Sequence, residues 1–243
     1  MKKPKMILFD LGHTLICESS FNGIRGTEAV LKYVIRNENN LSAEEVSRFS
    51  EKMFTEMGRL ARDNGVEVHN LTIQKLVYEY LQIDVSLSPE EMEQIFWDNA
   101  APAVTMPNIH RALDYLKEHD IRTGVISNIA FSGNSVKKKI DCLMPNNNFE
   151  FIIASSEYAI RKPNPMIFEL ALRKAKLPAN EVWYCGDNTK FDVYGASAAG
   201  IFPVWFHSPL ECDYRDKSLD MKPDCEHLYI NDWLEFIEVL EHL

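Results

Sequence analysis

The hydrophobic pattern of the chain begins with a short apolar run that ends at an acid. Residues Met6 to Phe9 are all apolar, Asp10 follows directly, and Gly12 comes two positions later. A continuous apolar run of this length, followed by a turn residue, is typical of a buried strand. Because ligands bind at the carboxyl ends of the strands in an open parallel sheet, we expect Asp10 to lie at a functional edge.

The pattern then becomes helical, and we predict no strand between about Glu18 and Pro107. Apolar residues recur there with helical spacing, and two segments open with helix-start signals. Ser42 and Glu45 form a capping box, and residues 88–91 read Ser-Pro-Glu-Glu. Four consecutive amphipathic helices favour a bundle inserted after the first strand. The predicted helices span 27–37, 42–63, 71–83 and 88–100.

Predicted helices and short apolar strands alternate from Pro107 onward. This alternation is typical of a parallel sheet with helices on both faces. The polar segment 213–224 is interpreted as a surface loop. We expect strands at 123–126, 149–154, 181–185 and 201–206, and helices at 109–118, 135–143, 163–176, 192–199 and 233–243.

The sequence therefore predicts an α/β fold with two parts. The core is a doubly wound, Rossmann-like parallel sheet formed by residues 1–17 and 101–243. Residues 18–100 form an inserted, all-helical cap domain. The apolar stripes of the cap helices pack the bundle or support dimer contacts, so the chain is expected to be a monomer or a homodimer.

Composition and charge are those of an ordinary globular protein. The 243 residues are 46% hydrophobic and 26% charged, with a formal net charge of −10. Because there is no long basic stripe, we expect no nucleic-acid partner, and Lys137 to Lys139 are interpreted as a solvated helix face. The apolar run after Lys5 is too short for a signal peptide or a membrane span, so we expect no membrane partner and a cytoplasmic location. Five cysteines without a C-x-x-C pair agree with free thiols, and the seven histidines give no support to a zinc site.

Polar side chains follow the main predicted strands. Asp10 follows the first strand, Ser127 and Asn128 follow the second, and Asp187 follows a later one, while Lys162 precedes a helix. A doubly wound sheet brings such positions to one edge. Two carboxylates there would repel each other without a cation between them, and hard oxygen ligands favour Mg²⁺. Lys162 and Ser127 would then contact the other side of a phosphate group.

Four signatures in this order resemble those of the haloacid dehalogenase-like hydrolases with an α-helical, C1-type cap. They are FDLGHTL around Asp10, VISN ending at Asn128, RKPNPMIF around Lys162, and GDNTKFDVYGASAAG from Gly186 to Gly200. The resemblance covers nearly the whole chain. It implies a Mg²⁺-dependent phosphatase that acts on a small phosphorylated metabolite.

The resemblance also implies catalytic and substrate-binding roles. Asp10 matches the family nucleophile, which attacks phosphorus and forms an aspartyl-phosphate. Ser127 matches the hydroxyl that binds the transferring phosphoryl group, and Asn128 flanks it. Lys162 matches the lysine that screens the nucleophile from the phosphate.

A metal site is implied in the same way. Asp10 and the backbone carbonyl of Gly12 match two magnesium ligands. Asp187 matches a further direct ligand, and Asp192 matches a second acid that supports the site.

One position departs from the family pattern. Phosphatases of the family usually carry a second aspartate two residues after the nucleophile, where it serves as general acid and then as general base; this chain has Gly12. Loss of a positioned general acid typically costs about 10²- to 10⁴-fold in rate. His13, Glu18 or a cap side chain could replace it. Some branches of the family with glycine at this position resemble sugar-phosphate phosphatases.

Other functions remain open at this point. The 2-haloacid dehalogenases also lack the second acid, but they do not retain the pattern formed by Gly186, Asp187 and Asp192. A phosphonatase would need a cap lysine for a Schiff base, and Lys32 is available. A catalytically impaired member that binds a phospholigand or a partner is a further alternative. Arg25, close after the opening strand, is a candidate contact for an anion.

Overall fold

The computed structural model describes residues 2–210 and 221–243. Its centre is a six-stranded parallel sheet with the strand order β10-β9-β8-β1-β6-β7. In chain order this is the 3-2-1-4-5-6 arrangement of doubly wound folds, so the predicted core architecture is confirmed. The strands are β1 (Met6–Phe9), β6 (Arg122–Ser127), β7 (Phe149–Ala154), β8 (Val182–Gly186), β9 (Phe202–Phe206) and β10 (Leu228–Ile230).

Both faces of the sheet are covered by helices. Ile7 and Phe9 of β1 belong to the core cluster under α5, α6 and α10, whereas Met6 and Leu8 belong to the cluster under α8 and α9. All four side chains are fully buried, which explains why this strand is a continuous apolar run. The helices are α5 (Ile109–Glu118), α6 (Gly133–Leu143), α8 (Pro165–Ala175), α9 (Tyr194–Ala198) and α10 (Trp233–Glu241).

The chain reverses its direction of winding next to β1. Phe9 is paired with Val125 of β6 on one side and with Cys185 of β8 on the other. A crevice forms at such a switch point, beyond the carboxyl ends of the strands. Asp10 and the residues after Cys185 therefore meet at this edge of the sheet.

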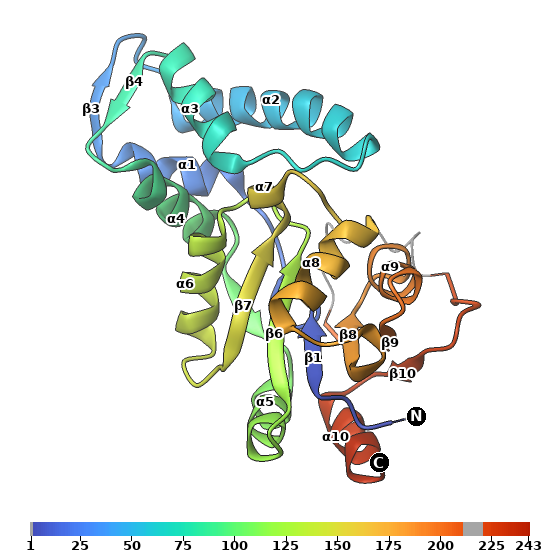
Figure 1. The fold of residues 1–243 in the computed structure, drawn as a ribbon. Coiled ribbons are helices and arrows are strands. Elements are labelled where there is room, and N and C mark those ends of the chain that lie inside the picture. The colour runs from blue at the N-terminus through green and yellow to red at the C-terminus, as the bar shows by residue number, and fades with distance from the viewer. Residues whose placement is uncertain (1, 211–220) are drawn as a thin grey trace.

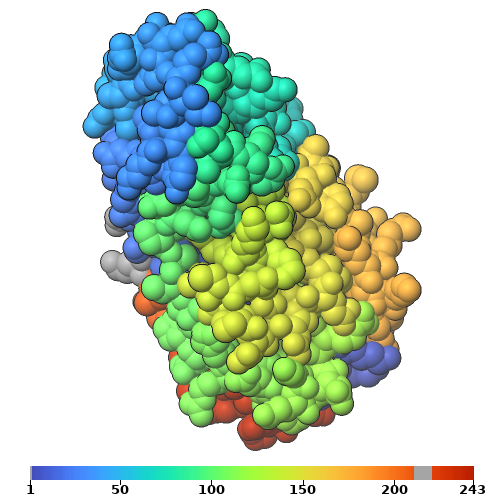
Figure 2. Space-filling view, turned by 90° about the vertical axis from the view of Figure 1, so that its left-hand side faces the viewer, coloured from blue at the N-terminus to red at the C-terminus, as the bar shows by residue number. Residues whose placement is uncertain are grey.

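The segment inserted after β1 is mainly helical. Figure 1 shows it above α7 and the end of β7, and Figure 2 shows its blue and cyan atoms as a lobe resting on the green and yellow core. Both expected capping boxes are present, at Ser42 with Glu45 and at Ser88 with Glu91. The helices are α1 (Gly23–Leu31), α2 (Ala43–Asp63), α3 (Asn70–Tyr80) and α4 (Pro89–Ala100).

The prediction that this segment holds no strand is wrong. The expected helix 27–37 ends at Leu31, and β3 (Val34–Asn37) pairs antiparallel with β4 (Ile83–Val85). Helical spacing places Val34 and Ile35 on one apolar stripe of the expected helix 27–37, but they are 42% and 70% exposed. β-Branched residues favour strands, and the tertiary partner β4 decides between the two structures.

Two more short strands join the inserted segment to the core. β2 (Ile16–Glu18) leaves the core and pairs antiparallel with β5 (Ala103–Thr105), which returns to it. Two further elements not predicted from the sequence are β10 and α7 (Ser155–Tyr158). A 3₁₀ turn (Ala179–Glu181) precedes β8, and a π-helical turn (Thr189–Val193) precedes α9.

The expected surface loop 213–224 lies largely outside the described residues. Among the described helices, none has the length and apolar character needed to cross a bilayer.

The interpretation of Lys137 to Lys139 as a solvated face holds only in part. Lys139 is buried. Its Nζ donates hydrogen bonds to Glu18 Oε1 (3.0 Å) and to the carbonyl of Ala101 (2.8 Å), next to the β2–β5 connection. The lysine therefore neutralises a carboxylate where the chain passes between core and inserted segment.

Candidate active site

Asp10 lies at the centre of the sheet edge. Its backbone N–H donates to the carbonyl of Cys185 (2.8 Å), which continues the parallel pairing one residue beyond β1. The residue is 8% exposed, and its Oδ1 accepts a hydrogen bond from Lys162 Nζ at 2.7 Å. The strand thus fixes the backbone of Asp10, and the lysine fixes one oxygen of its carboxylate.

Lys162 is the hub of the site. Its Nζ donates to Asp10 Oδ1 (2.7 Å), to Asp192 Oδ1 (2.6 Å) and to the Tyr184 hydroxyl (2.7 Å), which uses all three ammonium protons. Burial alone would lower the pKa of Lys162, but the charges of Asp10 and Asp192 outweigh this effect and raise it. The lysine therefore remains a cation inside the protein.

The carboxyl group of Asp10 has a perturbed pKa. Burial, opposed by the charge of Lys162 and reinforced by that of Asp192, raises the pKa of Asp10 to about 6. Perturbed groups of this kind concentrate at functional sites, because catalysis needs side chains whose proton can be exchanged near neutral pH.

The amide of Asn128 holds Lys162 in place. Asn128 Oδ1 accepts from the backbone N–H of Lys162 (2.7 Å), and Asn128 Nδ2 donates to the carbonyl of Lys162 (3.0 Å). The end of β6 is thereby tied to the segment that carries the ammonium. Ser127, the last residue of β6, is buried at the same edge.

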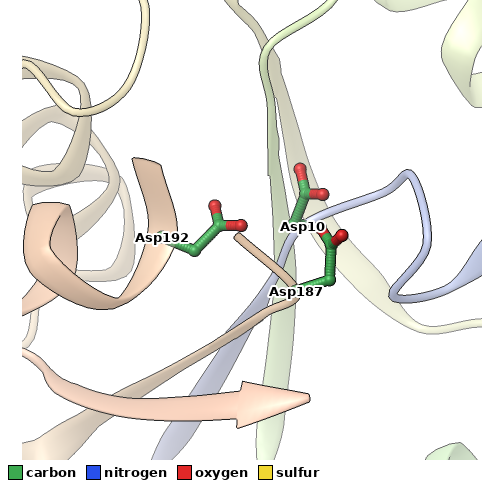
Figure 3. Close-up of side chains that lie close together, drawn as sticks. All are labelled: Asp10, Asp187 and Asp192. Carbon is green, nitrogen blue, oxygen red and sulfur yellow. The ribbon is translucent and has the colours of Figure 1, made fainter. Parts of the chain in front are cut away.

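A cluster of three acids completes this edge. Oxygens of Asp10, Asp187 and Asp192 lie within 4.8 Å of one another, and all three residues are buried. Figure 3 shows the carboxylates of Asp10 and Asp187 side by side, with that of Asp192 directed toward them from a helical turn. Gly186 allows this approach, because a Cβ at that position would lie 2.4 Å from the side chain of Asp192.

The acids fit a hard divalent cation. Asp192 is engaged through Oδ1 with Lys162 and through Oδ2 with the backbone N–H of Asn188 (2.9 Å). The carboxylates of Asp10, Asp187 and Asp192 lie close enough together to share one cation. Buried acids repel one another and lose hydration, and a cation relieves both costs.

Gly12 lies in the turn after Asp10, where its backbone bridges to Ile16. A Cβ at Gly12 would meet no atom within 4 Å, and its φ is outside the left-handed region. Position 12 thus has the space and the backbone conformation for a side chain, although glycine provides none.

The structure distinguishes between the side chains that could replace the general acid missing at position 12. Glu18 accepts hydrogen bonds from Trp97 Nε1 (2.8 Å) and Lys139 (3.0 Å), which gives it a structural role at the connection. His13 remains in the turn, with φ of 54° and its N–H donating to the carbonyl of Ile16 (2.7 Å). It is therefore the candidate that stays beside Asp10 in sequence and in the turn.

Two candidates from the inserted segment lie elsewhere. Arg25 is exposed and donates through Nε to the carbonyl of Asn99 (2.5 Å), at the end of α4. Its guanidinium satisfies a helix terminus rather than reaching into the site. Lys32 is exposed at the C-terminal end of α1.

Tyr184 is the site residue that the sequence analysis missed. Its hydroxyl accepts from Lys162 and lies 3.1 Å from both Asp192 Oδ1 and the carbonyl of Ile126. Burial raises the pKa of Tyr184 well above its ordinary value, so the phenol keeps its proton. The sequence signal that could have identified Tyr184 is its position within a fully buried strand, because a buried hydroxyl needs a polar partner.

Comparison with known proteins agrees with this geometry. The sequence model of the haloacid dehalogenase-like hydrolases matches residues 7–206. A glyceraldehyde 3-phosphate phosphatase from Pyrococcus furiosus is 25% identical over 249 aligned positions, covering 99% of this chain and 95% of the relative.

Solved structures share the fold. A 2-haloacid dehalogenase from Pseudomonas syringae has a TM-score of 0.63 at 22% identity, covering 98% of this chain and 99% of the other. A phosphatase from Thermococcus onnurineus has a TM-score of 0.60 at 17% identity, with 97% of each chain covered. Both chemistries thus occur on this fold, so the fold alone does not decide between them. Because the family's sequence model matches most of the chain, the chain belongs to the haloacid dehalogenase-like hydrolase family.

Proposed function

We propose that this protein is a Mg²⁺-dependent phosphatase that hydrolyses a small phosphate monoester through an aspartyl-phosphate on Asp10. The observation that carries the proposal is the contact between Lys162 and both Asp10 and Asp192, next to Asp187. A carboxylate can attack an anionic phosphoryl group only where positive charge offsets the repulsion. Archaeal relatives named glyceraldehyde 3-phosphate phosphatase support a small phosphorylated substrate.

Each residue of the site has a separate role in phosphoryl transfer. Asp10 Oδ2 attacks phosphorus while Lys162 holds Oδ1, and the bond from phosphorus to the ester oxygen breaks. Ser127 donates a hydrogen bond to a phosphoryl oxygen, and Asn128 keeps Lys162 in register. Water then attacks the aspartyl-phosphate, which restores Asp10 and releases inorganic phosphate.

The metal would be held by Asp10, Asp187 and the carbonyl of Gly12, with Asp192 in support. When bound, Mg²⁺ supplies positive charge that orients the phosphoryl oxygens and offsets the charge of the acids.

Proton transfer to the leaving alcohol is the step for which position 12 offers no side chain. His13 is the nearest residue in sequence whose ordinary pKa suits that transfer. The protein should therefore act best on esters whose leaving group needs little protonation.

The inserted residues 18–100 act as the cap over a core formed by residues 1–17 and 101–243. Closure of such a lid excludes water during phosphoryl transfer. The enzyme acts in the cytoplasm, as a monomer or homodimer, without a nucleic-acid or membrane partner.

The test is hydrolysis of p-nitrophenyl phosphate and acetyl phosphate with Mg²⁺, compared with the Asp10→Asn variant. We expect turnover by the wild type and none by the variant, with circular dichroism showing that both are folded. Equal rates for the two proteins on both substrates would overturn the proposal. Halide release from 2-chloropropionate without metal would instead support a dehalogenase.

A further inference from the structure

A cavity of about 580 Å³ lies between the inserted segment and the core. Its floor includes Asn128 and Phe131, which follow β6, and its roof is formed by α2. Asn128 also holds the backbone of Lys162, so the cavity adjoins the proposed phosphoryl site. A substrate whose phosphate lies at Asp10 would place its alcohol part here.

The roof helix gives the cavity two distinct ends. Ser47 lies beside Gly23 of α1, since a Cβ at Gly23 would be 2.9 Å from Ser47 Oγ. Arg62, which also lines the cavity, is on the same helix about 22 Å further along, at 1.5 Å per residue.

Aromatic rings gather at the end near α1. The cavity is lined by Phe21, which precedes α1, by Phe54 of α2 and by Phe96 of α4, and the centroids of Phe21 and Phe96 are 6.1 Å apart. Phe21 is 52% exposed. On the floor, Phe131 is held flat by stacking on Trp97, with centroids 4.3 Å apart. Covering the accessible parts of these rings with an apolar ligand is favourable, because apolar surface leaves water.

Charged residues also line the cavity. Glu51 and Glu67 are matched in number by Arg62 and Arg161. Arg161 NH1 lies 3.4 Å from Glu67 Oε2, and Ser155 Oγ donates to the same oxygen at 3.1 Å. The ion pair of Arg161 and Glu67 thus lies directly next to Lys162 in the chain.

We infer that the substrate is the phosphate monoester of an alcohol that carries an aromatic or similarly flat apolar ring, which packs among Phe21, Phe54 and Phe96. The inference rests on the proposed phosphatase function and narrows its substrate class. Small-molecule pockets span about 300 to 1,000 Å³, a range that includes this cavity. The ring contributes binding energy remote from the reacting atoms.

The test compares 2-phenylethyl phosphate with n-propyl phosphate and glyceraldehyde 3-phosphate. The first two release primary alkanols, so their need for a proton donor is matched. Since even one buried methylene changes kcat/KM by about tenfold or more, we expect 2-phenylethyl phosphate to exceed n-propyl phosphate by at least about tenfold.

Single substitutions test whether Phe21 causes the preference for 2-phenylethyl phosphate. Phe21→Ala should lower kcat/KM for 2-phenylethyl phosphate about tenfold more than for n-propyl phosphate, mainly through KM. Phe21→Tyr, which keeps the ring, should retain the preference for 2-phenylethyl phosphate. Tyr33→Ala removes an aromatic side chain of similar exposure that does not line the cavity, and it should change neither substrate.

The outcomes separate the inference from the function on which it rests. Equal efficiency on 2-phenylethyl and n-propyl phosphates, or a preference for glyceraldehyde 3-phosphate over both, would overturn the ring-bearing class and leave the phosphatase intact. Failure to hydrolyse any of these esters, together with p-nitrophenyl phosphate, would overturn the phosphatase function and the inference with it.

Discussion

Lys162 Nζ lies 2.7 Å from Asp10 Oδ1, although the two residues are 152 positions apart in the chain. The same ammonium also contacts Asp192, so one cation serves two buried carboxylates. Removing one member of a buried ion pair leaves an uncompensated charge, which is more costly than the loss of an exposed pair. The contact thus links the stability of the protein to its chemistry.

Replacement of Lys162 by methionine should lower both activity and stability. Hydrolysis of p-nitrophenyl phosphate should fall by about 10³-fold, since the charge that offsets phosphate repulsion is lost. Urea denaturation should show a loss of about 3 to 5 kcal/mol in the free energy of unfolding. Lys174→Met, at an exposed position of α8, is the matched control and should change neither quantity. Activity retained in Lys162→Met would contradict the assigned role.

Magnesium binding near pH 6 should release protons. Burial raises the pKa of Asp10 from 3.8 to about 6 in the metal-free protein, so about half of the molecules carry a proton on Asp10 at that pH. A bound cation favours the ionised carboxylate and expels this proton. Calorimetry in buffers of different ionisation enthalpy measures the release, and Asp10→Asn should remove it. Proton release that persists in the variant would assign the proton to another group.

The raised pKa of Asp10 also determines whether the free energy of unfolding rises or falls with pH. The folded state holds the Asp10 proton more tightly than the unfolded chain, so this residue favours folding below pH 3.8 and progressively loses that contribution as the pH rises to about 6. In metal-free protein, Asp10→Asn should therefore flatten the fall in the free energy of unfolding over this window. Urea midpoints measured from pH 4 to 7 give the comparison, and parallel profiles for both proteins would refute it.

Gly12→Asp should add the missing acid. The position has room for a side chain and an ordinary φ, so the substitution should leave the fold intact. Turnover of n-propyl phosphate should rise by about 10²-fold, whereas p-nitrophenyl phosphate, whose leaving group needs little protonation, should change little. Gly12→Ala controls for the added bulk and should match the wild type. A uniform rise or fall on both substrates would show that proton supply does not limit turnover.

Glu93 should anchor α4 to the core. This fully buried carboxylate accepts hydrogen bonds from the backbone N–H (3.2 Å) and hydroxyl of Ser132 and from Ser135 Oγ (2.9 Å), at the start of α6. Glu93→Ala would leave these donors unsatisfied and should lower the free energy of unfolding by about 3 kcal/mol in urea. The exposed Glu169→Ala should be neutral. A neutral Glu93→Ala would show that water replaces the carboxylate.

Local pattern predicted most of the core. Helix α5 and strand β7 occupy the predicted residues, because apolar period and turn residues coincide there. In the inserted segment the same reasoning failed at Val34 and Ile35, whose helical spacing was outweighed by pairing with β4. Short segments carry little local preference, so their partners decide.

The sequence by itself determined the order of the main core strands and helices, the place of Asp10 after β1, and the motif residues that lie at one edge of the sheet. It could do so because buried strands and helix starts leave local patterns. Only the tertiary structure decided that Tyr184 joins Lys162, that Lys139 is buried against Glu18, and that aromatic rings from separate elements line one cavity. These contacts join residues distant in sequence, and no local pattern encodes which buried polar groups or exposed rings will meet.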